Sequence, residues 1–147
     1  MGTSKTFNFV LCAMLLLPAA GIAQEMTMAD LNNPQKLAGD ELRQLLTGAK
    51  VKNMTRQGST RYWNNDPDGK FTASTDSQGY KGRPTTRPSS GAGSWHISPL
   101  DQYCVTIEWK TTAENWCYFV FKSGDKFYGA TKQSDPSARV VEFEFGK

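Results

Sequence analysis

Few residue groupings in this sequence have the types and spacing that catalytic chemistry needs. The chain has one histidine, His96, which alternates with Trp95 and Ile97. Because alternate residues of a strand face opposite sides, we expect His96 to point away from the core. Ser and Asp residues are plentiful, but the sequence has no Gly-x-Ser-x-Gly nucleophile elbow. We therefore predict no catalytic residue and expect a non-enzymatic protein.

One run of oxygen ligands resembles the start of a calcium-binding loop. Asn64, Asp66 and Asp68 alternate and precede Gly69, and alternating oxygen ligands suit a hard cation. The last position of such a loop needs a bidentate Glu, and Thr75 stands there. We therefore predict a tight hairpin turn at this place, with no metal and no other cofactor.

Three carboxylates on predicted strands are the remaining candidates for acid–base work. Glycoside hydrolysis needs two carboxyl groups roughly 5–9 Å apart in a cleft. Glu108, Glu142 and Glu144 alternate with apolar residues, a pattern that a solvated sheet face explains, so they are weak candidates for a site. An enzyme that acts on envelope polymers therefore stays open as a third choice of function.

Aromatic residues are the most informative group in the sequence. The chain has 4 Trp, 5 Tyr and 8 Phe, and a small β domain must bury most of them. Aromatic rings also bind sugars and other ligands that have an apolar face. Three tryptophans are candidate ligand-facing residues: Trp63, Trp95 and Trp116.

Residues 1–23 have the features of a secretory signal peptide. Lys5 provides a positive charge, an apolar run extends to Leu17, and small residues end at Ala23. The apolar run is about half of the roughly 20 residues needed to span a bilayer. We predict cleavage after Ala23 and a periplasmic or secreted product without a membrane span.

Cleavage would leave two of the three cysteines, Cys104 and Cys117, in the mature chain. An exported chain with two cysteines most simply forms one disulfide. Its loop would stabilise the fold by about 3 kcal/mol in the chain-entropy model. Two free thiols or a soft-metal pair are the alternatives, although the spacing is too long for a Cys-x-x-Cys site. We predict the disulfide.

The mature chain is expected to be a flexible lead-in, 24–39, followed by one β-rich domain, 40–147. The domain begins with a helix signal from Asp40 to Gly48. Asp40 can cap the free amides of the first turn, and Gly48 can adopt the left-handed conformation that ends a helix. Three leucines share one face of this helix: Leu42, Leu45 and Leu46.

Short strand patterns separated by turns fill the rest of the chain. Eight segments are predicted strands: 50–56, 60–64, 70–75, 93–98, 102–110, 115–122, 126–131 and 139–145. Their short links force antiparallel neighbours, since a parallel crossover needs about a dozen residues. The predicted fold class is mainly β: an antiparallel meander of about eight strands that forms a small barrel or curved sheet, with one short N-terminal helix.

Alternation along these strands predicts which side chains form the core. Two segments supply one inward face each: Tyr103, Val105, Ile107 and Trp109, and Val141, Phe143 and Phe145. The segment 115–122 is apolar on both sides, with Trp116, Tyr118 and Val120 on one face and Phe119 and Phe121 on the other. Such strands are usually covered on both faces. We favour a cover supplied by the helix or the lead-in, with an apolar ligand pocket as the alternative.

One long stretch, 76–93, has no strand pattern. It is rich in Gly, Pro, Ser and Thr, and nothing in it is expected to build a strand core. Loops of this length inside a compact domain are often functional or disordered. Its basic and aromatic residues form a candidate interaction loop: Tyr80, Lys81, Arg83 and Arg87.

Several short motifs occur in an order that resembles a known family. They are Asp66-Pro67-Asp68-Gly69-Lys70-Phe71, Gly93-Ser94-Trp95-His96-Ile97, Tyr103-Cys104-Val105 and the segment 117–128. Over roughly residues 37–145 the chain resembles small exported proteins of unknown function, found mostly in proteobacteria. The resemblance implies a periplasmic β-rich domain without catalytic residues. The Gly-x-Trp motif is also similar to that of lipocalin-like barrels, although here it lies mid-chain instead of on the first strand.

These observations give an order of expected functions. The first is a non-enzymatic periplasmic or secreted binding or interaction module, whose partner is an unknown protein or glycan of the cell envelope. The second is an inhibitor of an exported hydrolase such as a lysozyme, with the stretch 76–93 as the inserting wedge. The net charge of +3 is too small to argue for nucleic-acid binding.

Overall fold

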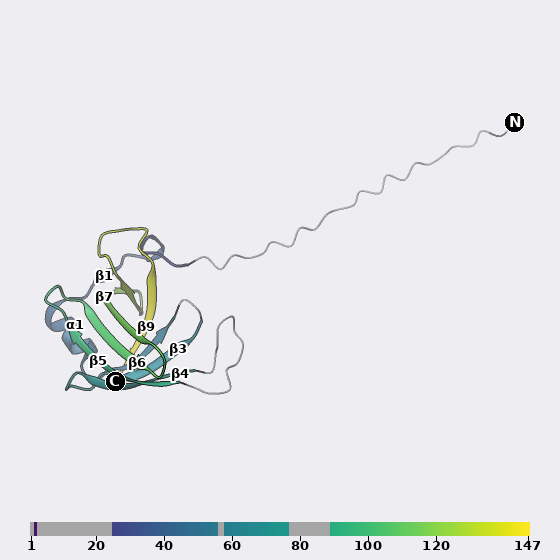
Figure 1. Ribbon diagram of the computed structural model, residues 1–147. Coiled ribbons are helices and arrows are strands. Elements are labelled where there is room, and N and C mark those ends of the chain that lie inside the picture. Colours follow the sequence, from purple (N-terminus) through teal and green to yellow (C-terminus); the bar gives the residue numbers. More distant parts are fainter. Residues whose placement is uncertain (1, 3–24, 56–57, 77–88) are drawn as a thin grey trace.

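The structure is a computed structural model that describes residue 2 and residues 25–55, 58–76 and 89–147 (Figure 1). Apart from residue 2, the predicted signal peptide lies outside the described residues. The four candidate residues of the interaction loop also lie outside them: Tyr80, Lys81, Arg83 and Arg87.

The described residues form one short helix and nine strands. In chain order these are a 3-10 turn Met28–Asp30, β1 Gln35–Lys36, α1 Gly39–Leu46, β2 Lys50–Met54, β3 Thr60–Asn64, β4 Lys70–Thr75, β5 Ser90–Ile97, β6 Tyr103–Trp109, β7 Ala113–Ser123, β8 Lys126–Ala130 and β9 Val140–Gly146. The two predicted strands at 60–64 and 70–75 have the bounds that the sequence indicated.

Strands β2 to β9 form a closed antiparallel barrel of eight strands. Each strand pairs with the next along the chain, and the first and last pair with each other, with Val51 opposite Phe145. Closure satisfies the backbone groups that an open sheet would leave at its two edges. The predicted meander is confirmed, and of its two predicted forms the structure has the barrel.

Strand β1 is an addition to the barrel beside β7. The first half of β7 pairs with β6, and its second half, 119–123, pairs with β8. Residues Gln35 and Lys36 pair with Lys122 and Phe121, on the part of β7 that extends beyond β6. Figure 1 shows β1 and β7 side by side. The length of β7 thus provides the N-terminal segment with a strand to bind.

The same N-terminal segment covers the outer face of β7 and β8. Phe119 and Phe121 are buried there in a second apolar cluster, against which Met28 and Leu31 pack. The sequence predicts that either the helix or the segment before it covers the second apolar face of this strand. In the structure the segment before the helix covers it. Residues 25–39 pack here because the outward-facing rings of β7 and β8 give their apolar side chains a surface to bury against.

Helix α1 packs against one end of the barrel, at the left of Figure 1. Its Leu42 and Leu46 are fully buried among core residues of the strands, and Leu45 packs beside them. Gly48 follows with a φ of 70°, in the left-handed region that the helix stop requires. The terminal Lys147 donates from Nζ to the carbonyl oxygens of Gln44, Leu45 and Thr47.

The start of α1 differs from the prediction that Asp40 caps the helix. The N-cap residue is Ala38, which has no capping side chain, and Asp40 lies in the first turn. The Gly39 amide instead donates to Asp101 Oδ1, 3.1 Å away in the β5–β6 turn. A carboxylate from a distant turn takes over the capping role because the tertiary fold brings it to the helix N-terminus.

Strand β5 begins at Ser90, inside the stretch that was expected to have no strand. Its glycines are required by close packing. A Cβ built on Gly93 would lie 2.0 Å from the Phe71 ring, and one on Gly91 would lie 2.7 Å from the Glu108 carbonyl oxygen. The strand prediction was wrong here because Gly normally weakens a strand, whereas these two glycines make room for neighbouring rings and backbone.

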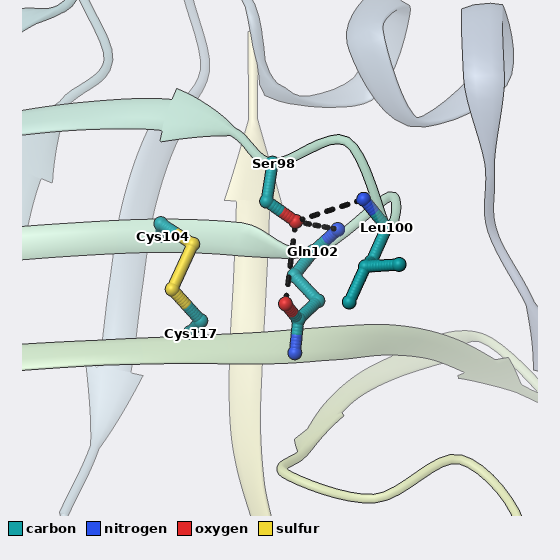
Figure 2. Close-up of a disulfide and its surroundings, with 5 residues drawn as sticks. All are labelled: Ser98, Leu100, Gln102, Cys104 and Cys117. Atoms are coloured by element: carbon teal, nitrogen blue, oxygen red, sulfur yellow. Dashed lines mark hydrogen bonds between the residues drawn. A yellow bond between two sulfur atoms is a disulfide. The ribbon is translucent and has the colours of Figure 1, made fainter.

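The cysteines form the predicted disulfide, Cys104–Cys117, with an S–S distance of 2.02 Å. The two residues are directly opposite in the β6–β7 ladder. Figure 2 shows the bond beside the β5–β6 turn, where Ser98 Oγ accepts from the amides of Leu100 and Gln102. The covalent link therefore ties β7 to the strand that this turn begins.

A buried polar cluster joins α1, β3 and β6. Trp63 Nε1 donates to both Asn65 Oδ1 and Tyr103 Oη, each 3.0 Å away, and Tyr103 Oη donates to Asn65 Oδ1 at 2.8 Å. Asn65 Nδ2 donates to the carbonyl oxygen of Leu46, the last residue of α1. Asn65 has no exposed surface, so each of these bonds replaces water that cannot reach it.

We predict an alkaline loss of stability that depends on Tyr103. Burial raises the pKa of the Tyr103 hydroxyl, although its hydrogen bonds to Trp63 and Asn65 act in the opposite direction. The folded-state pKa thus exceeds that of the unfolded chain, about 10. The protonated Tyr103 hydroxyl makes its full contribution to the free energy of unfolding below about pH 10. This contribution is lost as the pH rises further.

The measurement is urea unfolding between pH 8 and 11 for the parent chain, Tyr103→Phe and Tyr62→Phe. Tyr62 is exposed on the outer face and serves as the matched control. We expect Tyr103→Phe to be less stable at pH 8 by about 1 kcal/mol and to lose less free energy of unfolding toward pH 11. Equal alkaline losses in Tyr103→Phe and the parent chain would contradict the assignment.

Candidate functional site

The two ends of the barrel differ. One end is covered by α1 and filled by the buried cluster around Asn65. At the other end, where β2 finishes and β3, β7 and β9 begin, there is a cavity of about 450 Å³. Its lining residues are Glu25, Asn53, Thr55, Arg61, Glu114, Trp116, Tyr118 and Val141. We call this cavity the mouth of the barrel.

An ion pair crosses the barrel at the mouth. Arg61 comes from β3 and Glu114 from β7, strands that lie on opposite sides of the eight-stranded ring. Arg61 Nη1 donates to Glu114 Oε2, and Glu114 Oε1 accepts from Trp109 Nε1 at 3.0 Å. The carboxylate thus has a partner on each oxygen, and the pair joins two walls that share no backbone hydrogen bond.

The Arg61 guanidinium is only partly satisfied. Its carbon lies 5.7 Å from the centre of the Trp109 ring, a cation–π distance. Its Nε atom is buried and has no hydrogen-bond partner among the described residues. A guanidinium carries only donors, so this N–H can be satisfied only by an acceptor that the described residues do not supply.

Aromatic rings form one wall of the mouth. The rings of Trp116 and Tyr118 lie 4.8 Å apart and are inclined by 33°. Both project inward from β7, and Val141 lines the cavity from β9. The mouth therefore offers a flat apolar wall together with a charged pair whose net charge is zero.

The three candidate ligand-facing tryptophans lie in different surroundings. Trp63 is buried in the core, where it stacks on Phe71 and bonds to Asn65. Trp95 lies near the covered end of the barrel and donates from Nε1 to the Asp66 carbonyl oxygen at 2.8 Å. Trp116 lines the mouth. The rings of Trp63 and Trp116 lie 6.4 Å apart, but each of the three tryptophans lines a different cavity.

A groove of about 620 Å³ beside α1 contains Trp95 and His96. Its carboxylates are occupied by the local backbone: Asp68 Oδ1 accepts from the Lys70 amide, and Asp101 Oδ1 accepts from the Gly39 amide. His96 is exposed on the outer face of β5, as alternation predicted. This groove consequently has less to offer a ligand than the mouth.

The turn that resembled a calcium loop is the β3–β4 hairpin. Gly69 has a φ of 81° and its amide donates to the Asp66 carbonyl oxygen at 3.0 Å. These are the backbone requirements of a tight turn. Among the described residues, no group of three or more His, Cys, Asp and Glu side chains could hold a metal ion.

The strand carboxylates face outward. Glu142 pairs with Lys126 and Glu144 pairs with Lys52, both on the outer face of the barrel. Glu108 is exposed on β6. The solvated-face interpretation of these carboxylates is confirmed for all three.

Arg61 and Glu114 were not among the residues expected at a site. Arg61 lies two residues before Trp63, and Glu114 lies two before Trp116, so alternation places both on inward faces. Glu114 was missed because the strand was expected to begin at Asn115, whereas β7 begins at Ala113. An Arg and a Glu in phase with inward tryptophans was the available signal.

No protein-family model, no curated protein and no solved structure matches this chain. The resemblance to small exported proteobacterial proteins therefore stays a prediction. Among the described residues, no helix has the length and apolarity needed to cross a membrane.

We predict that Glu114 contributes measurably to stability. In Glu114→Ala the Arg61 guanidinium and the Trp109 indole N–H would lose their partner inside the mouth. About a fifth of the Arg61 side chain and a quarter of the Glu114 side chain are exposed, so we expect a loss of about 1–2 kcal/mol.

Urea unfolding measures this loss, and Glu108→Ala is the matched control. Glu108 is an outward glutamate on the neighbouring strand β6, where truncation should change the free energy of unfolding by less than about 0.5 kcal/mol. If both variants unfold at the urea concentration of the parent chain, the pair does not join the two walls energetically.

Proposed function

We propose that this protein is a non-enzymatic binding module that takes a small ligand into the mouth of its barrel. One observation carries the proposal. The mouth combines a cavity of about 450 Å³ with a buried Arg61 Nε–H that has no partner among the described residues. A buried donor without an acceptor is costly for folding alone, and a ligand that supplies the acceptor would relieve this cost.

The size and lining of the mouth support this proposal. Ligand cavities are mostly about 300–1,000 Å³, with an apolar wall and a few polar groups that fix orientation. The mouth has such a wall in Trp116 and Tyr118 and such a group in Arg61. Barrel ends are also common places for ligands in folds of this size.

Export to the periplasm or outside the cell is part of the proposal. The predicted signal peptide supports it, and so does the Cys104–Cys117 disulfide, because disulfides persist in oxidising compartments. The proposed ligand source is accordingly the cell envelope or its surroundings. The hydrolase-inhibitor alternative depends on the stretch 76–93, most of which lies outside the described residues.

The proposal predicts that the mouth binds N-phenyl-1-naphthylamine, an uncharged probe that fluoresces in apolar sites. Val141→Trp would replace a small aliphatic side chain with an indole ring, which would fill the mouth and exclude the probe. The burial of one aromatic ring of the probe contributes about 1.5–3 kcal/mol to its binding free energy. Because this contribution would be lost, we expect the affinity for the probe to fall roughly tenfold or more.

Thr72→Trp is the matched control, since it adds the same ring on the exposed outer face of β4. We expect this variant to bind the probe as the parent chain does. Absence of probe binding, or equal binding by Val141→Trp and Thr72→Trp, would refute the mouth as the binding site. Thermal unfolding of both variants checks that each is folded.

A further inference from the structure

We infer that the ligand of the mouth is uncharged and has a flat apolar body with a carbonyl-type oxygen at one edge. This inference rests on the proposed function and adds the chemical class of the ligand. Three properties of the mouth carry it: the charge balance of its ion pair, its free donor and the shape of its aromatic wall.

The charge balance argues against an anion. An arginine in a cavity ordinarily attracts carboxylates and phosphates, but here Glu114 already neutralises Arg61. An anionic group that reached Arg61 would also come close to the Glu114 carboxylate, and the two like charges would repel each other. The other charged lining residue is the carboxylate Glu25, which pairs with Arg139 at 2.7 Å. The lining residues therefore supply no uncompensated positive charge that would attract an anion.

The free donor argues for an oxygen acceptor. Arg61 Nε is buried without a partner among the described residues, while its Nη1 is bound to Glu114. Arg61 is one of the lining residues of the cavity, so a rotation of its side chain would turn the buried Nε–H toward a ligand oxygen. A ligand group that only donates hydrogen bonds would leave this N–H without an acceptor and could not itself bond to the arginine, which has no acceptor atom.

The wall argues for a flat body. Trp116 and Tyr118 present adjoining ring faces, with Val141 also lining the cavity. Aromatic faces prefer offset stacking or edge contact with another ring. A ligand that stacks on this wall and points its oxygen toward Arg61 would use the apolar and the polar parts of the mouth together.

The test is displacement of bound N-phenyl-1-naphthylamine by three naphthalenes that differ only in the substituent at position 2. 2-Naphthamide carries an uncharged carbonyl, 2-naphthoate carries a carboxylate, and 2-methylnaphthalene carries neither. We expect 2-naphthamide to displace half of the probe at about five- to tenfold lower concentration than either of the others. The parent chain alone suffices for this comparison.

Glu114→Gln is the sharper variant, because it removes the balancing charge and keeps the side-chain shape. The mouth then has a net positive charge, so the order of the two ligands should reverse and 2-naphthoate should become the better competitor. Glu108→Gln makes the same change on the outer face of β6 and should keep the order of the parent chain.

The outcomes separate this inference from the proposed function. If the probe does not bind the parent chain, the proposed function itself fails. If the probe binds but 2-naphthoate competes as well as 2-naphthamide, the mouth is a site and the uncharged ligand class is wrong. If Glu114→Gln keeps the order of the parent chain, the charge-balance argument is overturned.

Discussion

The fold depends on the hydrogen bonds of one fully buried side chain, Asn65. Its amide group accepts from Trp63 and Tyr103 and donates to the end of α1, while its backbone pairs with Gly48 and Ala49. A buried amide that lost these partners would be destabilising by far more than an apolar contact of the same size. Helix, barrel wall and aromatic core are therefore held in one arrangement at this point.

This arrangement makes the barrel asymmetric. Rings packed around Tyr103 fill the interior, with Trp95, Trp116, Phe143 and Phe145 at centroid distances of 5.6–6.3 Å. Trp116 is the member of this set that also lines the mouth. At the mouth the interior residues include a charged pair instead of a complete layer of rings. Rigid packing at one end and a partly satisfied polar pair at the other is the physical basis for placing the site at the mouth.

The sequence was sufficient for the parts of the fold that follow from alternation. The meander, the inward face of β6 and the Cys104–Cys117 link could all be predicted, since a period of two and short turns leave few choices. The lead-in was less predictable. Its 3-10 turn and β1 form only because β7 is long and apolar on both faces, which is a property of another segment.

The site was the least predictable part. Alternation places Trp63 and Trp116 on equivalent inward faces, so it does not tell which of the two lines the mouth, and in the structure only Trp116 of this pair does so. The Arg61–Glu114 pair joins residues on opposite strands of the ring, so no local pattern connects them. Gly93 shows the same limit, because its role depends on the Phe71 ring of the neighbouring strand.

The most direct measurement of this account is the solvent exchange of the tryptophan indole N–H groups, followed by NMR in the ¹⁵N-labelled protein with and without N-phenyl-1-naphthylamine. Trp63 donates into the buried cluster, whereas Trp109 donates to Glu114 at the mouth. We predict that the Trp63 N–H exchanges far more slowly than the Trp109 N–H, and that the probe shifts the Trp109 signal and leaves that of Trp63 in place. Exchange of Trp63 as fast as that of Trp109, or a probe-induced shift at Trp63 without one at Trp109, would contradict it.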